Sequence, residues 1–468
     1  PAMPLPGLST PLLRRAAASR RSSTLPALLS RAISQAPRPT PSAGPASRPS
    51  LLPLAASALA AATLLTAATA AAASTPPAKK ETMATRPFAA LESSPDAEDG
   101  LLEFSVVYTD RALNHMSKKF QHTFNDICGT LKEVYCCTAA VILPGSGSYA
   151  MEAAARAFCT DKKALVIRNG YFSYRWSDIF ACTGLVSAEV TVPAFPIDDS
   201  PNPSYRPPLI EDVVAAIKSE KPACVFAPQV DTSSGILIPD DYIKAVADAA
   251  HEVGAIFVLD CVAAGCLWAD MNTLGVDVLV TAPQKGWSGP AGAGLVMLAP
   301  RAEEALKAGD GGKSFAINLK KWYDIMKAYE NGGHAYFCTM PTDALVAFRE
   351  RQLEAQARGF ENMKAEQKAL GASVRSSLEK RGVKSVAAPG FQSPTVVVSY
   401  TEDMGMKTGA KFAAAGVQIA AGVPLMVDAF TKSGDFKTFR LGLFGLDKLE
   451  DVNKTMANLN MVLDTVIA

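Results

Sequence analysis

Short apolar runs alternate with amphipathic stretches between about Phe104 and Pro300. Five of the runs are rich in β-branched residues and predict strands, at 164–168, 223–228, 255–260, 276–280 and 294–298. They are apolar at nearly every position rather than at alternate ones, which is typical of strands buried on both faces of a mostly parallel sheet. Helical patterns lie between them, at 210–218 and 243–253. This succession predicts an α/β domain with helices on both faces of the sheet.

The pattern changes after Pro341. Two long helical stretches, 343–357 and 360–381, are separated near Gly359. Strands at 394–400 and 439–444 and a helix at 446–466 follow. We therefore predict a large α/β domain over residues 81–345 and a smaller α+β domain over residues 346–468.

The first 80 residues differ from the rest in charge. They contain seven Arg and two Lys but no Asp or Glu, interleaved with Ala, Leu and Ser. This composition is typical of an organelle-targeting leader, so we expect residues 1–80 to be a targeting or disordered segment, mitochondrial with plastid as the alternative. The apolar run 51–74 is long enough for a membrane span. It is rich in Ala and Thr and interrupted by Pro53, so no stable membrane insertion is expected; a second targeting signal or an anchor is the alternative.

Charge, cysteine and histidine usage exclude several functions. After residue 80 the chain holds 37 basic and 45 acidic residues, a net charge of −8. Because this part of the chain is net negative and lacks clustered Lys and Arg, its charge does not favour binding to nucleic acid. Nine dispersed cysteines without a CxxC motif, and four histidines without metal-ligand spacing, predict reduced thiols and no metal site.

Three features along the α/β part carry candidate chemistry. The segment 144–152 places two glycines before a helix, whose first amides and hydroxyls suit a phosphate. Asp260 ends a strongly apolar strand, and Lys285 follows the strand that ends at Val280 among small residues. The glycine loop and the acid are each commonly structural when they occur alone, whereas a solvated surface role fits Lys285 poorly. In this order they meet the requirements of pyridoxal phosphate: a phosphate cup, an acid for the ring nitrogen and a lysine for the aldimine.

From about Phe104 to the C-terminus the chain resembles the class V aminotransferases of pyridoxal-phosphate fold type I. It is similar to the alanine–glyoxylate and serine–pyruvate aminotransferases. The resemblance implies a mostly parallel-sheet large domain, a smaller C-terminal α+β domain and a homodimer. It is carried by seven segments, at 145–148, 168–172, 230–235, 258–262, 283–286, 336–341 and 439–445.

The resemblance also implies roles for individual residues. Lys285 would form the cofactor aldimine and Asp260 would pair with the ring nitrogen, and both would be catalytic. Arg440 would bind the substrate carboxylate, for which a planar guanidinium is suited. The remaining implied cofactor-binding residues are Ser146, Gly147, Ser148 and Gln284 at the phosphate, Tyr336 and Thr339 at the phosphate from the partner subunit, Phe172 and Val262 on the two faces of the ring, and Thr232 at the ring hydroxyl.

The function implied by the resemblance is transamination between a small amino acid, alanine or serine, and a 2-oxo acid, with glyoxylate the leading acceptor. Residues 103–117 depart from the family pattern near the substrate mouth, which leaves donor and acceptor open. A pyridoxal-phosphate lyase of the same fold, β-eliminating or desulfurase-like, is the first alternative. A non-catalytic relative and an adenosine- or nicotinamide-dependent α/β enzyme are the others, although Lys285, Asp260 and Arg440 have no purpose in a scaffold.

Overall fold

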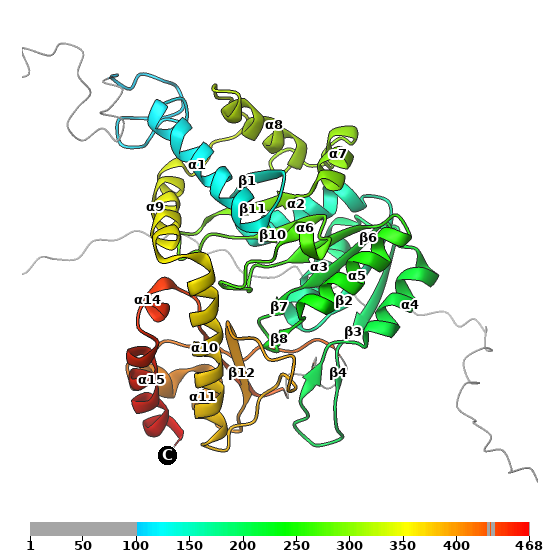
Figure 1. Ribbon diagram of the computed structural model, residues 1–468, viewed down its shortest axis with the longest axis vertical. Coiled ribbons are helices and arrows are strands. Elements are labelled where there is room, and N and C mark those ends of the chain that lie inside the picture. The colour runs from blue at the N-terminus through cyan, green and yellow to red at the C-terminus, as the bar shows by residue number, and fades with distance from the viewer. Residues whose placement is uncertain (1–100, 428–430, 432–435, 468) are drawn as a thin grey trace, which may run out of the picture. The chain divides into compact units, whose positions relative to one another are not determined.

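The computed structural model describes residues 101–427, 431 and 436–467 (Figure 1). The predicted leader at 1–80 and its apolar run at 51–74 lie outside the described residues. Among the helices that are described, none is long and apolar enough to cross a membrane.

A seven-stranded sheet forms the centre of the α/β part, in the order β1-β11-β10-β9-β6-β2-β3. All its neighbouring pairs are parallel except the two made by β11, which runs antiparallel to β1 and β10. The predicted mostly parallel sheet is therefore confirmed. Its strands are β1 (Ala139–Gly145), β2 (Lys163–Arg168), β3 (Ala188–Pro193), β6 (Cys224–Pro228), β9 (Ile256–Asp260), β10 (Val278–Thr281) and β11 (Gly292–Leu298).

The five predicted strands are all in this sheet, whereas β3 was not predicted. β3 is an edge strand with mostly exposed or half-buried residues, so it lacks the continuous apolarity by which the central strands were found. β1 leads into the predicted glycine segment at 144–152 and is not among the five predicted strands. Two short sheets consist of two strands each: β4 (Phe195–Pro196) with β5 (Tyr205–Arg206), and β7 (Val230–Asp231) with β8 (Ile236–Leu237). A further two-residue strand, β13 (Ala420–Ala421), pairs with β14 (Thr438–Gly442).

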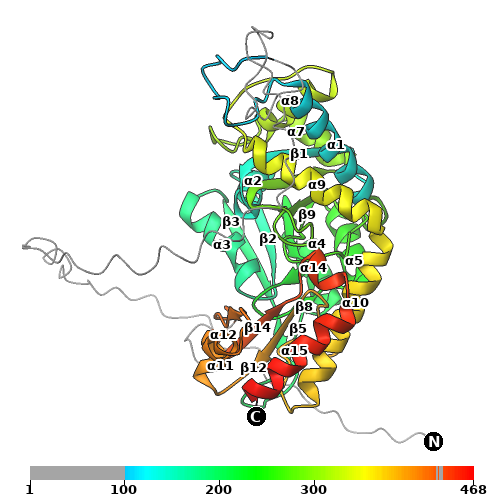
Figure 2. The same cartoon turned by 90° about the vertical axis from the view of Figure 1, so that its left-hand side faces the viewer.

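Helices cover both faces of the sheet. Figure 2 shows α3 on one side of the strands and α4 and α5 on the other. On α1, apolar residues such as Phe120, Phe124 and Leu131 recur at helical spacing and are fully buried. The helices of this part are α1 (Lys118–Tyr135), α2 (Gly147–Cys159), α3 (Tyr171–Thr183), α4 (Ile210–Glu220), α5 (Asp240–Glu252), α6 (Met271–Leu274), α7 (Pro300–Ala308) and α8 (Leu319–Glu330).

Beyond residue 341 the chain forms two long helices and a small antiparallel sheet. α9 (Thr342–Arg358) and α10 (Phe360–Glu379) meet at Gly359, whose φ of +87° favours glycine. β14 (Thr438–Gly442) lies between β12 (Val396–Tyr400) and β13, and α10 packs beside α15 and β12 (Figure 1). The remaining helices are α11 (Met404–Thr408), α12 (Ala410–Ala414), α14 (Leu446–Leu449) and α15 (Val452–Ile467).

The prediction of a single helix at 446–466 is wrong in one respect, because this segment forms two helices, α14 and α15. Asp451 begins the second helix: its carboxylate accepts a hydrogen bond from the amide of Lys454 at 2.9 Å, as an N-cap residue does. The strand predicted at 439–444 ends at Gly442. The domain boundary at residue 345 falls inside α9 and stays a prediction.

Candidate active site

Three of the predicted site residues lie at one edge of the central sheet. β9 and β10 are parallel, and β1 runs in the same direction because both β1 and β10 are antiparallel to β11. The carboxyl ends of these strands therefore meet at the edge where open α/β sheets bind ligands. Asp260 is the last residue of β9, Ser146 follows β1, and Lys285 follows β10.

A cavity of about 230 Å³ opens at this edge. Of the twelve predicted site residues, it brings together nine: Ser146, Gly147, Ser148, Phe172, Thr232, Asp260, Val262, Gln284 and Lys285. The remaining lining residues are Met151, Arg175, Val230 and Ala263.

The phosphate-loop candidate is held by close packing at the start of α2. Gly145 has a φ of +130°, and a Cβ there would lie 2.6 Å from the ring of Tyr149. A Cβ on Gly147 would lie 2.8 Å from a methyl group of Val262. Ser146 is the N-cap residue, but its hydroxyl makes no capping hydrogen bond. The first amides of α2 and this hydroxyl thus form a donor set suited to an anion.

Asp260 is buried at the carboxyl end of β9, with 6% of its surface exposed. Its Oδ1 accepts a hydrogen bond from the amide of Val262 at 2.9 Å. Burial raises the pKa of Asp260 to about 7, because the Val262 hydrogen bond and the charge of Arg175 only partly offset desolvation. A protonated ring nitrogen would supply the positively charged donor that this carboxylate lacks among its protein neighbours.

The amine of Lys285 is enclosed by groups from the C-terminal part of the chain. Its Nζ lies 5.2 Å from the ring centroid of Phe444. Burial lowers the pKa of Lys285, and the positive charges of Arg440 and Arg175 lower it further. A neutral amine is therefore easier to form here than in solution, which favours both nucleophilic attack and proton uptake. The preceding residue, Gln284, has a buried Oε1 for which the described residues offer no hydrogen-bond partner.

A buried carboxylate fixes the start of α3, the helix that carries Phe172. Asp231 accepts hydrogen bonds from the amide and hydroxyl of Ser173 at 2.8 and 2.7 Å, and from those of Ser233 at 2.9 and 2.7 Å. A Cβ on Gly170 would lie 2.1 Å from the Ser233 hydroxyl, so the helix can approach this closely only at glycine. The position of the Phe172 ring therefore depends on Asp231.

Three predicted residues do not line the cavity. Arg440, on β14, donates from Nε to the carbonyl of Ala421 at 2.8 Å, and its guanidinium lies 5.7 Å from the Phe172 ring centroid. Arg440 is thus beside the cavity. Tyr336 and Thr339 are hydrogen-bonded to each other at 3.2 Å in an exposed loop, and the structure does not bring them to the cavity of their own chain.

Arg175 was not singled out from the sequence, yet it lines the cavity. Its Nη1 donates to the hydroxyl of Ser148 at 2.8 Å, and its guanidinium lies 5.1 Å from the Phe172 ring centroid. A signal for it existed: residues three apart lie on the same face of a helix, and Arg175 is three residues after Phe172.

The residues present fit pyridoxal phosphate. The free hydroxyl and amides at the start of α2 suit the phosphate, the buried carboxylate of Asp260 suits a protonated ring nitrogen, and the amine of Lys285 suits the aldehyde. The roles assigned to each residue stay predictions.

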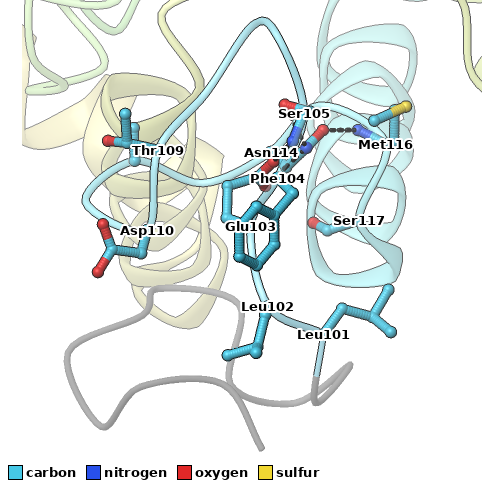
Figure 3. Close-up of a pocket in the computed structure, with 11 residues that line it drawn as sticks. Leu101, Leu102, Glu103, Phe104, Ser105, Thr109, Asp110, Asn114, Met116 and Ser117 are labelled. Atoms are coloured by element: carbon cyan, nitrogen blue, oxygen red, sulfur yellow. Dashed lines mark hydrogen bonds between the residues drawn. The ribbon is translucent and has the colours of Figure 1, made fainter. Parts of the chain in front are cut away.

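A second and larger cavity, of about 390 Å³, lies along residues 101–117 (Figure 3). Its polar groups pair with one another: Glu103 accepts from the amide of Ser105 and the side chain of Asn114, both at 2.8 Å, and Asn114 accepts from the amide of Met116 at 2.8 Å. It shares no lining residue with the first cavity and offers no convergent reactive groups.

The sheet and the residues at its edge define a class, the pyridoxal-phosphate-dependent enzymes of fold type I. The chain belongs to the class V aminotransferase family, since the family described as Aminotransferase class-V matches residues 97–454. It is therefore an enzyme of the aminotransferase type that uses pyridoxal phosphate.

The similarity to individual relatives is low in sequence identity. L-aspartate–glyoxylate aminotransferase of Paracoccus denitrificans is 27% identical over 278 residues, 59% of this chain and 67% of that protein. Alanine–glyoxylate aminotransferase 1 of Saccharomyces cerevisiae is 28% identical over 258 residues, 51% of this chain and 64% of that protein. The chain thus spans about two thirds of the length of these curated relatives. Alanine–glyoxylate aminotransferase of Nostoc sp. shares the fold, with a TM-score of 0.62 and 20% identity over 75% of this chain and 89% of that chain.

Proposed function

We propose that this chain transfers an amino group from a small amino acid, alanine or serine, to glyoxylate. The observation that carries the proposal is the convergence of Lys285, Asp260 and the start of α2 on one cavity. Family membership supports transamination. Glyoxylate is the acceptor named for both curated relatives, whereas their donors differ, aspartate in one and alanine in the other.

The chain's own residues suggest how the reaction would proceed. When bound, pyridoxal phosphate supplies an electron-accepting ring that stabilises negative charge at the substrate Cα. Asp260 would hold the ring nitrogen in its protonated form. Burial lowers the pKa of Lys285. Its Nζ would accept the proton from the substrate Cα and donate it to the former aldehyde carbon of the cofactor. Arg440 would bind the substrate carboxylate and thereby orient the Cα–H bond.

A lyase of the same fold would share the cofactor contacts but break a different bond. A desulfurase additionally needs a cysteine that can reach the substrate. None of the nine cysteines, all of which are described, lines the cavity. This argues against the desulfurase alternative and leaves β-elimination as an outcome of the test.

The test is a panel of alanine, serine and aspartate as donors against glyoxylate and pyruvate, with Lys285→Ala as the inactive control. We expect parallel-line, ping-pong kinetics with glyoxylate and no ammonia. Ammonia release without any oxo acid would instead establish a lyase. An absence of turnover with every pair, together with no binding of pyridoxal phosphate, would contradict the proposal.

We further propose that the enzyme is a homodimer in which Tyr336 and Thr339 reach the partner's site. In support, both residues lie in an exposed loop, and Tyr336 is 52% exposed. Size-exclusion chromatography with light scattering would measure the mass, and a monomer at micromolar concentration would contradict the dimer.

The arginine-rich leader is proposed to direct the protein to mitochondria, with plastids as the alternative. Its support is compositional alone: nine positive charges and no acidic residue in residues 1–80. A fusion of these residues to a fluorescent protein would report the destination, and a diffuse signal would overturn the targeting role.

A further inference from the structure

We propose that Arg175 supplies the fixed positive charge for a phosphate group bound at the start of α2. The inference rests on the proposed function, because it assigns a residue to the phosphate of the cofactor. Arg175 also contacts the ring of Phe172, which comes from the same helix.

The geometry places the guanidinium at the anion site itself. Arg175 lines the cavity, and its Nη1 donates to the hydroxyl of Ser148 at 2.8 Å. Ser148 is in the first turn of α2, one residue after Gly147. The guanidinium carries five N–H donors in a planar fork, so one hydrogen bond to Ser148 leaves others for phosphate oxygens.

A count of charge shows why a cation is needed there. A phosphate monoester carries about −1.5 to −2 charges at neutral pH, and a helix N-terminus offsets only about half a charge. The phosphate ligands predicted from the sequence are all uncharged: Ser146, Gly147, Ser148, Gln284, Tyr336 and Thr339. Among the described residues that line the cavity, the cations are Lys285, which is assigned to the aldehyde, and Arg175.

Among the residues that the structure describes, no carboxylate forms an ion pair that would explain the position of Arg175. Within the described residues it forms no ion pair with a carboxylate, although it lies close enough to lower the pKa of Asp260. Arg156, at the other end of α2, is by contrast ion-paired with Glu152 at 2.7 Å. The two arginines therefore form a matched pair for mutation, one with and one without a carboxylate partner.

The position of Arg175 also couples the phosphate to the ring-binding residue. Its guanidinium lies 5.1 Å from the centroid of the Phe172 ring, within the range of a cation–π contact. Both side chains come from α3, whose start is fixed by Asp231. A phosphate held by Arg175 would thus be held at a set distance from Phe172.

The experiment compares pyridoxal phosphate with pyridoxal, which lacks the phosphate. Dissociation constants for both would be measured by equilibrium dialysis on the full-length wild type, Arg175→Gln, Arg175→Lys, Ser148→Ala and the control Arg156→Gln. We expect Arg175→Gln to weaken binding of pyridoxal phosphate roughly tenfold to hundredfold, the effect of one charge-assisted hydrogen bond. The affinity of Arg175→Gln for pyridoxal should change less than about threefold, because pyridoxal lacks the phosphate that this hydrogen bond would hold. Arg156→Gln should bind both compounds as the wild type does.

Several outcomes would overturn the inference. Equal weakening of both compounds would mean that Arg175 acts on the ring or on Lys285 and not on the phosphate, and no weakening of either would remove it from the site. If Arg175→Gln fails to fold by circular dichroism, Arg175→Lys decides: it keeps the charge but loses the planar fork of donors, so it must weaken pyridoxal phosphate more than pyridoxal. Failure of the wild type to bind either compound is a distinct result, which overturns the proposed function and the inference with it.

Discussion

The buried carboxylate of Asp260 gives a pH-dependent stability that can be measured. Its pKa of about 7 in the folded chain lies well above its ordinary value of 3.8. The folded state therefore retains a proton between about pH 4 and pH 7 that the unfolded state has lost, and stability falls as the pH rises through this range. Relative to Asp260→Asn, the cofactor-free wild type should lose about 2–3 kcal/mol between pH 5 and pH 7.

Urea denaturation of both proteins at the two pH values is the measurement. Saturation with pyridoxal phosphate should abolish the difference, because a protonated nitrogen beside the carboxylate stabilises its ionised form. An equal pH dependence of wild type and Asp260→Asn would show that this carboxyl group is ionised in the folded chain at pH 5.

At the residue scale, sequence order was enough to find the acid and the lysine but not Arg175. Asp260 and Lys285 follow buried strands, and parallel strands bring such positions to one edge. Arg175 lies within a helix, where a basic residue is usually solvated. Its spacing of three from Phe172 indicates only a shared helix face, and the packing of α3 against the start of α2 shows that this face meets the cavity.

At the element scale, Asp231 holds the start of α3 and should be among the most sensitive positions outside the reacting groups. It accepts hydrogen bonds from Ser173 and Ser233 and is fully buried. Asp231→Ala leaves two buried amides without partners, so it should lower the free energy of unfolding by about 3 kcal/mol. Thermal unfolding compared with Asp241→Ala, an exposed acid at the start of α5, measures the difference; equal losses would contradict this role.

The segment before α1 should respond to acid through His115. This side chain is 4% exposed and lies among Glu103, His334 and Tyr336. Within the part of the chain that the structure describes, its Nδ1 has no hydrogen-bond partner. Burial lowers the pKa of His115, and His334 lowers it further, whereas Glu103 opposes them. The unfolded state therefore binds the proton first, and stability is lost as the pH falls below about 6.5.

The His115→Gln variant isolates this contribution. From pH 7 to pH 5.5 the wild type should lose up to about 1 kcal/mol more than His115→Gln, whereas His122→Gln, an exposed histidine on α1, should behave as wild type. Identical acid sensitivity of all three proteins would show that His115 does not titrate differently in the folded chain.

At the scale of the whole molecule, hydrophobic pattern predicted the layers because buried parallel strands are apolar at every position. The edge strand β3 and the break between α14 and α15 escaped prediction, since both depend on polar residues in exposed positions. The predicted contribution of Tyr336 and Thr339 to the partner's phosphate site could not be derived from hydrophobic periodicity, because an exposed loop has no periodic pattern. That prediction rests on the resemblance to the family.

Complementation between two inactive variants tests whether this loop serves the partner's site. Lys285→Ala keeps the loop but lacks the amine, and the double variant Tyr336→Ala with Thr339→Ala keeps the amine but lacks the loop's side chains. Co-expressed with different tags and purified as heterodimers, the pair should recover about half of the wild-type activity per dimer, since one of two symmetric sites is then complete. Heterodimers of wild type with Lys285→Ala set the reference for one working site. If the loop instead serves the site of its own chain, the mixed variants stay as inactive as either parent, and the proposed contribution from the partner subunit is wrong.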